Sequence, residues 1–280
     1  MRISEIFQEK KPISFEIFPP KGELSMDSFH TTLEALSELH PAFISVTCSA
    51  GGSGGRDRTA ALAGIIRAQY GIEACAHLTC VNSTPEMLRE DVRKLHEEKI
   101  ENVLALRGDV IPDAPGRAFR YASELMTYLR DEGFCFGGAC YPEGHIECDD
   151  PAEDLRHLYE KQQAGASYFV SQLFFENDCF FRFLDAARNL GVTVPITAGV
   201  MPILSQAQIQ RMIFTCGASL PSDIIRILNR YADDPDALRQ AGIEHAARQI
   251  RDLLENGADG VHIYTMNRPA IATGIMELLK

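Results

Sequence analysis

The sequence predicts a single-domain α/β protein folded as a (β/α)8 barrel, also called a TIM barrel. Eight short runs rich in β-branched and aromatic residues alternate with segments of helical periodicity. The first seven runs begin 27 to 33 residues apart, which is the period of successive strand and helix units. A chain of 280 residues also has the length of one such barrel, for which about 250 is common.

The predicted strands are spread over the whole chain, at residues 13–18, 42–47, 72–79, 102–107, 134–141, 167–173, 194–200 and 260–265. The last strand begins 66 residues after the seventh, and within that step residues 221–231 and 236–255 have the pattern of extra helices. An open, doubly wound sheet is the alternative, because the number of strands does not prove closure. The barrel predicts in addition that functional residues cluster where strands end, on one rim.

Two of the connecting helices have clear start signals. Thr84 offers an N-cap before Pro85 and Glu86, and Asp150 precedes Pro151 in the same way. Gly165 ends the second of these helices. No linker rich in proline or glycine divides the sequence, so we expect residues 1–280 to form one domain.

Composition and charge narrow the class of protein. Hydrophobic residues make up 45% of the chain and charged residues 24%, which excludes a wholly disordered protein. The formal net charge of −12 disfavours binding to nucleic acid or to anionic lipid. The eight cysteines form no C-x-x-C pair, and no segment resembles a signal peptide or a membrane span. We therefore expect a cytoplasmic protein with reduced thiols.

Glu16 is the first candidate for chemistry, because it interrupts the apolar run ISFEIF. A buried carboxylate is costly without a partner. Either Glu16 faces a structural cation, or it holds its proton more tightly than usual, as a general acid does. The sequence leaves both possibilities open.

Polar residues also follow most of the other predicted strands. The fourth ends in Arg107, Gly108 and Asp109, a cation, a flexible position and an anion. Polar groups at seven strand ends favour a binding rim for a large aromatic ligand, with one acid available to move a proton. The further members are Thr47, His77, Thr79, Tyr141, Glu143, His145, Gln172, Tyr264, Asn267 and Arg268.

Other classes of site find little support. The glycine-rich segment 49–58 matches neither common nucleotide motif, so we interpret it as a flexible loop that could cover the rim. His77 lies between Cys75 and Cys80, but a second pair of ligands is missing, and we expect no metal. No G-x-S-x-G motif is present, and no strand ends in a lysine suited to a Schiff base.

Six motifs together resemble the methylenetetrahydrofolate reductase family, and they occur in the order of that family. They are FEIFPPK (15–21), SVT (45–47), HLTC (77–80), ALRGD (105–109), YPEGH (141–145) and HIYTMNR (262–268). The resemblance implies an FAD-dependent barrel with a ping-pong mechanism. NADH, slightly preferred over NADPH, would reduce FAD, and 5,10-methylenetetrahydrofolate would then accept the hydride to give 5-methyltetrahydrofolate for methionine synthesis.

The same resemblance implies roles for individual residues. Glu16 corresponds to the acid that protonates the departing ring nitrogen of the folate, and Asp109 to a carboxylate beside both flavin and pterin. Thr47, Asp109, Gln172 and Arg268 would contact the substrates. FAD would be bound by Thr47, Cys48, Ala50, His77, Arg107, Gly108, Asp109, Ala122, Tyr141, His145, Asp154 and Lys161.

The chain departs from this pattern in three respects. His157 and Glu160 stand where some relatives have Asn and Arg toward the FAD, and Gln206 stands where some have a Phe over the substrate. The regulatory domain that follows the barrel in eukaryotic forms is missing, so we expect no inhibition by adenosylmethionine.

Two other functions are kept as alternatives. In one, the chain is a flavin subunit of a larger complex and receives electrons from a companion electron-transfer subunit. In the other, it is a pterin-binding barrel without catalysis. A homo-oligomer is compatible with each of these functions.

Overall fold

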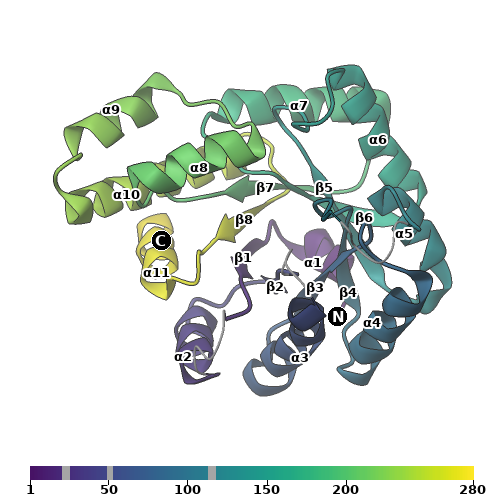
Figure 1. Cartoon of the computed structure of the whole chain (residues 1–280). Coiled ribbons are helices and arrows are strands. Elements are labelled where there is room, and N and C mark those ends of the chain that lie inside the picture. The colour runs from purple at the N-terminus through teal and green to yellow at the C-terminus, as the bar shows by residue number, and fades with distance from the viewer. Residues whose placement is uncertain (21–25, 49–52, 113–117) are drawn as a thin grey trace.

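The structure, a computed structural model, is a closed barrel of eight parallel strands. It describes residues 1–20, 26–48, 53–112 and 118–280, without the side chains of residues 53–57. Each strand pairs with its neighbours in chain order, and β1 pairs with β8 to close the sheet. The predicted (β/α)8 barrel is therefore confirmed, and the open sheet is excluded. The helices form an outer ring around the strands (Figure 1).

All eight strands occupy the predicted runs, although β6 begins one residue earlier than predicted. They are β1 (Ile13–Ile17), β2 (Ile44–Val46), β3 (Ala74–Thr79), β4 (Asn102–Leu106), β5 (Cys135–Cys140), β6 (Ala166–Ser171), β7 (Ile196–Val200) and β8 (Gly260–Tyr264). Nearly all of their residues are buried, because the helices cover one face of the sheet and the barrel interior encloses the other. Gly137 in β5 leaves the room that the Tyr168 ring fills, since a Cβ there would lie 2.4 Å from Tyr168 Cζ.

The helices connect the strands as the sequence predicts. They are α1 (Ile3–Glu9), α2 (Met26–Ser37), α3 (Ser53–Tyr70), α4 (Pro85–Glu97), α5 (Ala122–Tyr128), α6 (Pro151–Gln163), α7 (Asn177–Leu190), α8 (Gln206–Cys216), α9 (Ser222–Arg230), α10 (Pro235–Glu255) and α11 (Pro269–Leu279), with a short 3-10 helix at Arg130–Glu132. The two extra helices predicted before the last strand are α9 and α10, and α8 precedes them. None of the described helices is long and apolar enough to cross a lipid bilayer.

Both predicted helix starts are confirmed by their hydrogen bonds. Thr84 Oγ1 accepts a hydrogen bond from Met87 N at 3.2 Å, and Asp150 Oδ1 accepts one from Ala152 N at 2.9 Å. These bonds satisfy amide groups that have no partner within the helix. They fix the starts of α4 and α6 just beyond the ends of β3 and β5.

The prediction of a flexible loop over residues 49–58 is wrong for its second half. Helix α3 begins at Ser53, and residues 49–52 lie outside the described residues. Ala60, Ala63 and Ile66 recur on one face of α3 and are buried. Packing of this face stabilises α3. This effect is larger than the destabilisation caused by the low helix propensity of the two glycines in its first turn.

Helix α1 has no counterpart among the predicted elements, and it covers the amino-terminal end of the barrel. Ile3 and Ile6 are buried in a cluster with barrel residues such as Tyr168. Ile3 N donates to Asn102 Oδ1 at 2.8 Å, at the first residue of β4. Figure 1 shows α1 at the centre of the ring of strands. The opposite, carboxyl-terminal end of the barrel is therefore the end at which a ligand can enter.

Candidate active site

Glu16 lies inside the barrel and faces two imidazole rings. Its side chain comes from β1, and the residue is only 7% exposed. Glu16 Oε2 lies 3.5 Å from His77 Nε2 on β3 and 3.8 Å from His262 Nε2 on β8. Burial lowers the pKa of His77 to about 4, although Glu16 acts in the opposite direction. His77 is thus neutral near pH 7, and it does not give Glu16 a fixed positive charge.

His262 is held rigidly below Glu16. Its Nδ1 lies 2.7 Å from Ser14 Oγ and its Nε2 lies 3.1 Å from Ser45 Oγ, and all three residues are buried. His262 was not among the site residues expected from the sequence. No local signal could have found it, because its contacts with Ser14, Ser45 and Glu16 form only where β8, β1 and β2 meet in the closed barrel.

The end of β4 forms the next part of the rim. Gly108 has a φ of +82°, and a Cβ there would lie 2.9 Å from Thr79 Cβ, so this position requires glycine. Arg107 Nε donates to Gly108 O at 3.2 Å, and the guanidinium pairs with Glu147. The carboxylate of Asp109 belongs to an exposed residue beside this turn.

Asn82 holds the turn in place, although sequence reasoning missed it. Its Nδ2 donates to Asp109 O at 2.6 Å, and its Oδ1 accepts from Ile111 N at 3.0 Å. An asparagine just after a strand is common in turns, so the sequence alone gave no distinguishing signal.

Four of the predicted cofactor residues come together around β5 and α6. Lys161 Nζ donates to Ala139 O at 2.6 Å and lies 5.6 Å from the centre of the Tyr141 ring. The rings of Tyr141 and His145 are perpendicular, with centroids 4.6 Å apart, and His145 N donates to Asp154 Oδ2 at 3.3 Å. Burial lowers the pKa of Lys161 and raises that of Tyr141. This group places a half-buried lysine beside an aromatic ring.

Thr47 and Cys48 follow β2 and contact the neighbouring strands. Thr47 N donates to Ile17 O at 3.0 Å, and Cys48 Sγ lies 3.9 Å from Thr79 Oγ1. Ala50, predicted to bind the cofactor, lies outside the described residues.

Gln172 follows β6, and one end of its amide is fixed by the backbone. Its Oε1 accepts from Leu173 N at 2.9 Å, while its own N donates to Cys140 O at 2.7 Å. The amide nitrogen is then the end of this side chain that can donate to a ligand. Gln172 therefore suits hydrogen bonding to an acceptor such as a carbonyl or a ring nitrogen.

The last motif has mostly a structural role. Thr265 Oγ1 donates to Glu16 O at 2.6 Å, and the Asn267 side chain forms two hydrogen bonds with the backbone of Phe18, each 2.8 Å long. The hydroxyl of Tyr264 donates to Ser171 O at 2.7 Å. Arg268 is exposed at the start of α11, and Ala122 begins α5. Within the described ranges, no side-chain hydrogen bond or ion pair joins Arg268 to the other predicted residues.

The sequence raised a zinc site at Cys75, His77 and Cys80, but these three side chains do not come together. Cys75 Sγ lies 3.2 Å from the Tyr168 hydroxyl, whereas Cys80 Sγ contacts Arg107 O and Tyr121 O, and His77 faces Glu16. All eight cysteines are free thiols, as expected.

Two comparisons with known proteins match nearly the whole chain to the same family. Residues 2–280 match the family model described as methylenetetrahydrofolate reductase. The chain is 33% identical to 5,10-methylenetetrahydrofolate reductase of Escherichia coli over 268 residues, which cover 95% of this chain and 90% of the relative. It is also 33% identical to methylenetetrahydrofolate reductase 1 of Schizosaccharomyces pombe over 281 residues, 98% of this chain but only 46% of the relative, so it spans about half of that protein.

A solved structure shares the fold at low sequence identity. It is an uncharacterised protein from Clostridium thermocellum that binds two copies of 5-methyl-5,6,7,8-tetrahydrofolic acid. The TM-score is 0.71 at 15% identity, covering 99% of this chain and 98% of the other.

Proposed function

Because this chain belongs to the methylenetetrahydrofolate reductase family, we propose that it reduces 5,10-methylenetetrahydrofolate to 5-methyltetrahydrofolate, with FAD as cofactor and NADH or NADPH as donor. The substrates would react in turn, by a ping-pong mechanism, with NADH slightly preferred. We propose that residues 1–280 act as one catalytic domain in the cytoplasm.

The observation that carries the proposal is the position of Glu16. Opening the five-membered ring of the folate requires a proton on the departing nitrogen, and a carboxyl group shielded from water can deliver it. Glu16 is nearly buried, and its carboxyl group faces the imidazoles of His77 and His262. This environment suits a group that gives up a proton and recovers it in each cycle.

The residues around the rim fit a flavin nucleotide. His77 Nε2 is buried and forms no hydrogen bond within the described part of the chain, so a polar group of a ligand could satisfy it. Arg107 and Lys161 offer local positive charge to an anionic cofactor in an otherwise acidic protein. When bound, FAD would carry the hydride from the nicotinamide to the folate.

The other predicted residues would orient the substrates. Asp109, fixed by the Asn82 hydrogen bonds to its turn, would accept hydrogen bonds from the pterin ring. Gln172 would donate from its amide nitrogen to the folate and the nicotinamide in turn, and Thr47 would lie beside the nicotinamide. Arg268 would contact the acidic part of the folate.

Two half-reactions test the proposal. The purified chain should show the visible spectrum of a flavin, lose it when mixed anaerobically with NADH, and regain it when methylenetetrahydrofolate is added. Bound flavin that NADH does not bleach would contradict the proposal and favour the subunit of a larger complex. A colourless protein that still binds folate would favour the barrel without catalysis.

A further inference from the structure

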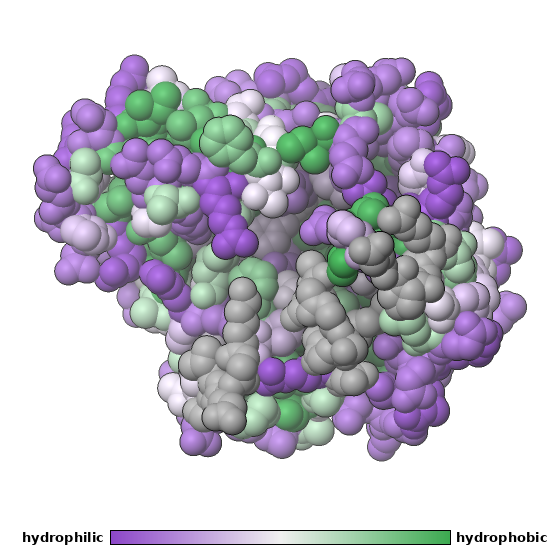
Figure 2. All heavy atoms as spheres, in the orientation of Figure 1, coloured by the Kyte–Doolittle hydropathy of each residue, from purple (hydrophilic) through white to green (hydrophobic). Residues whose placement is uncertain are grey.

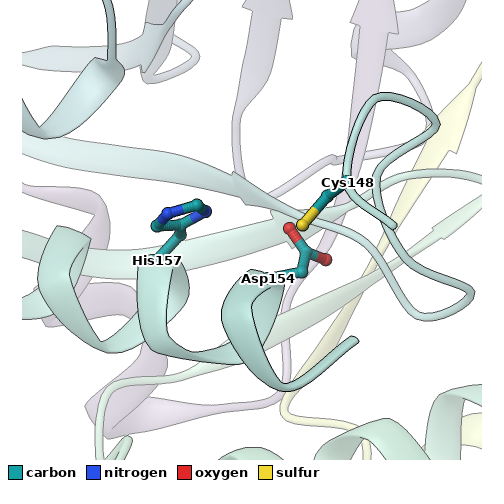
Figure 3. A group of neighbouring side chains, drawn as sticks. All are labelled: Cys148, Asp154 and His157. Carbon is teal, nitrogen blue, oxygen red and sulfur yellow. The ribbon is translucent and has the colours of Figure 1, made fainter. Parts of the chain in front are cut away.

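Cys148, Asp154 and His157 form a compact group beside the rim, and the proposed reaction uses only one of them. Figure 3 shows the three side chains, Cys148 from the loop after β5 and the other two from α6. One sulfur, one carboxylate oxygen and one ring nitrogen all lie within 4.8 Å of one another, and all three residues are half-buried. Within the described residues, no other three side chains of these types come together in this way.

Neighbouring groups orient each of the three side chains. His145 N donates to Asp154 Oδ2 at 3.3 Å, and Cys148 Sγ donates to Asp150 O at 3.3 Å. The His157 ring stacks with the Tyr121 ring at 5.9 Å between centroids and 28° between planes. The contacts of Asp154 and His157 are of the kind that fix ligand direction in the outer shell of a metal site, whereas the Cys148 S–H bond positions the thiol only until its proton is lost on metal binding.

Helix α6 places two of the three side chains close together, and the loop after β5 places the third beside them. Asp154 and His157 are three residues apart, so they lie side by side on the surface of α6. The backbone of the loop turns back at this point, since Cys148 N donates to His145 O at 2.8 Å. The sulfur is thereby directed toward the first turns of α6.

We propose that Cys148, Asp154 and His157 bind one divalent transition-metal ion, of which Zn²⁺ is the most fitting. Zinc binds thiolate, imidazole and carboxylate ligands, and sites with three protein ligands keep a fourth position for water. Mg²⁺ and Ca²⁺ prefer oxygen ligands only, and the sulfur and nitrogen therefore select against them. Binding transfers the Cys148 thiol proton to solvent, and the thiolate and carboxylate then neutralise the two charges of the ion.

A metal ion in this group departs from the expectation of no metal site, and through Asp154 it would share a side chain with the proposed FAD site. The spacing C-x5-D-x2-H belongs to no familiar zinc pattern, so these residues could not be grouped from the sequence. Asp154 also belongs to the residues expected to hold FAD, and the test leaves it unchanged for that reason.

The test is zinc binding by the full-length protein after treatment with a chelator. Zn²⁺ is titrated in competition with a chromophoric chelator for the wild type, for C148A and for H157N. Controls are C216A, which removes another half-buried thiol, and H96N, which removes an exposed imidazole outside the group. Circular dichroism of each variant confirms that it is folded.

We expect one zinc ion per chain, with affinity lowered at least about 100-fold in C148A and in H157N, because even loss of an outer-shell partner costs 10- to 100-fold. The controls should bind as the wild type does. With Co²⁺ as the probe, a thiolate-to-metal charge-transfer band should be present in the wild type and C216A and absent in C148A. Equal zinc affinity of wild type and C148A, or a cobalt band that survives in C148A, would overturn the proposal.

Discussion

The carboxyl group of Glu16 faces the imidazole rings of His77 and His262 inside the barrel. Because His77 is neutral near pH 7, the contact is not a permanent salt bridge. His262 is fixed by Ser14 and Ser45, so it cannot swing away from Glu16. The chemistry proposed for the site therefore depends on one carboxyl group and on the two imidazole rings that it faces.

Replacing Glu16 by Gln should separate the two half-reactions. The amide keeps the size of the side chain but cannot donate an acidic proton, so folate reduction should slow by about 10² to 10⁴-fold. Flavin reduction by NADH should be nearly unchanged, because it needs no proton from Glu16. Stopped-flow absorbance of the flavin measures both steps, with E38Q on the outer surface as control. Equal losses in both steps would refute the assigned role.

His77 should make the folded state less stable in acid. Its pKa in the folded protein is about 4, below the ordinary value of 6.5. Between these values the unfolded chain binds a proton that the folded protein does not, so stability rises with pH through this window and is complete above pH 6.5. The loss on going from pH 7 to pH 4 is about 3 kcal/mol for this group.

Urea unfolding of the wild type and of H77Q at both pH values measures this effect. The fall in unfolding free energy toward pH 4 should be smaller in H77Q, and unchanged in H96Q, in which an exposed imidazole is removed. An identical pH dependence in the wild type and H77Q would show that His77 does not carry the effect.

The residues of the candidate site are held in place by the starts of helices and the ends of strands. The side chains of Thr84 and Asp150 cap α4 and α6 immediately after the connections that leave β3 and β5. Gly108, with its positive φ, lets the chain turn directly against Thr79 at the end of β4. Short connections with defined hydrogen bonds hold the rim residues in place, and the strands supply the rigid support beneath them.

Helix α1 should contribute stability without contributing chemistry, because it packs at the barrel end opposite the site. Ile6 is 4% exposed, and I6A should lower the unfolding free energy by about 2–5 kcal/mol. The exposed position Glu9 on the same helix offers the control E9A, which should change stability little. Denaturant unfolding measures both variants. A loss of equal size in I6A and E9A would show that packing of α1 against the barrel is not the cause.

Across the whole molecule, closure of the sheet brings residues from distant parts of the chain to one end. Hydrophilic residues form most of the outline in Figure 2, hydrophobic residues gather over α8 and α9, and the face is hollowed near its centre. Phe214 on α8 is 82% exposed and Ile225 on α9 is 49% exposed. Gln172 is expected to contact the nicotinamide and the folate in turn, so the proposed reaction requires one substrate to leave before the other binds.

Steady-state kinetics should therefore show a ping-pong pattern. Double-reciprocal plots of rate against NADH, at several fixed concentrations of methylenetetrahydrofolate, should be parallel lines. Intersecting lines would mean that both substrates bind at the same time. That result would contradict the proposal that Gln172 contacts the nicotinamide and the folate in turn.

Much of the candidate site could be predicted from the sequence, because parallel strands of a barrel all end on the same side. Tyr141, His145, Asp154 and Lys161 lie together, and their binding of FAD stays a prediction. The partners of Glu16, the role of Asn82 and the grouping of Cys148 with His157 could not be predicted. Each depends on which side chains meet across strands or loops, and spacing along the chain does not contain that information.

The sequence by itself determined the number and order of the strands and the presence of helices between them, because the periodicity of apolar residues and the helix caps act over a few neighbouring positions. It also determined the family, through motifs at six strand ends. Only the tertiary structure decided that α1 closes one end, that the helix α3 continues over glycines, and that two imidazoles face Glu16. These features arise from packing between residues up to 248 positions apart, as Ser14 and His262 are, and such packing is fixed only once the barrel closes.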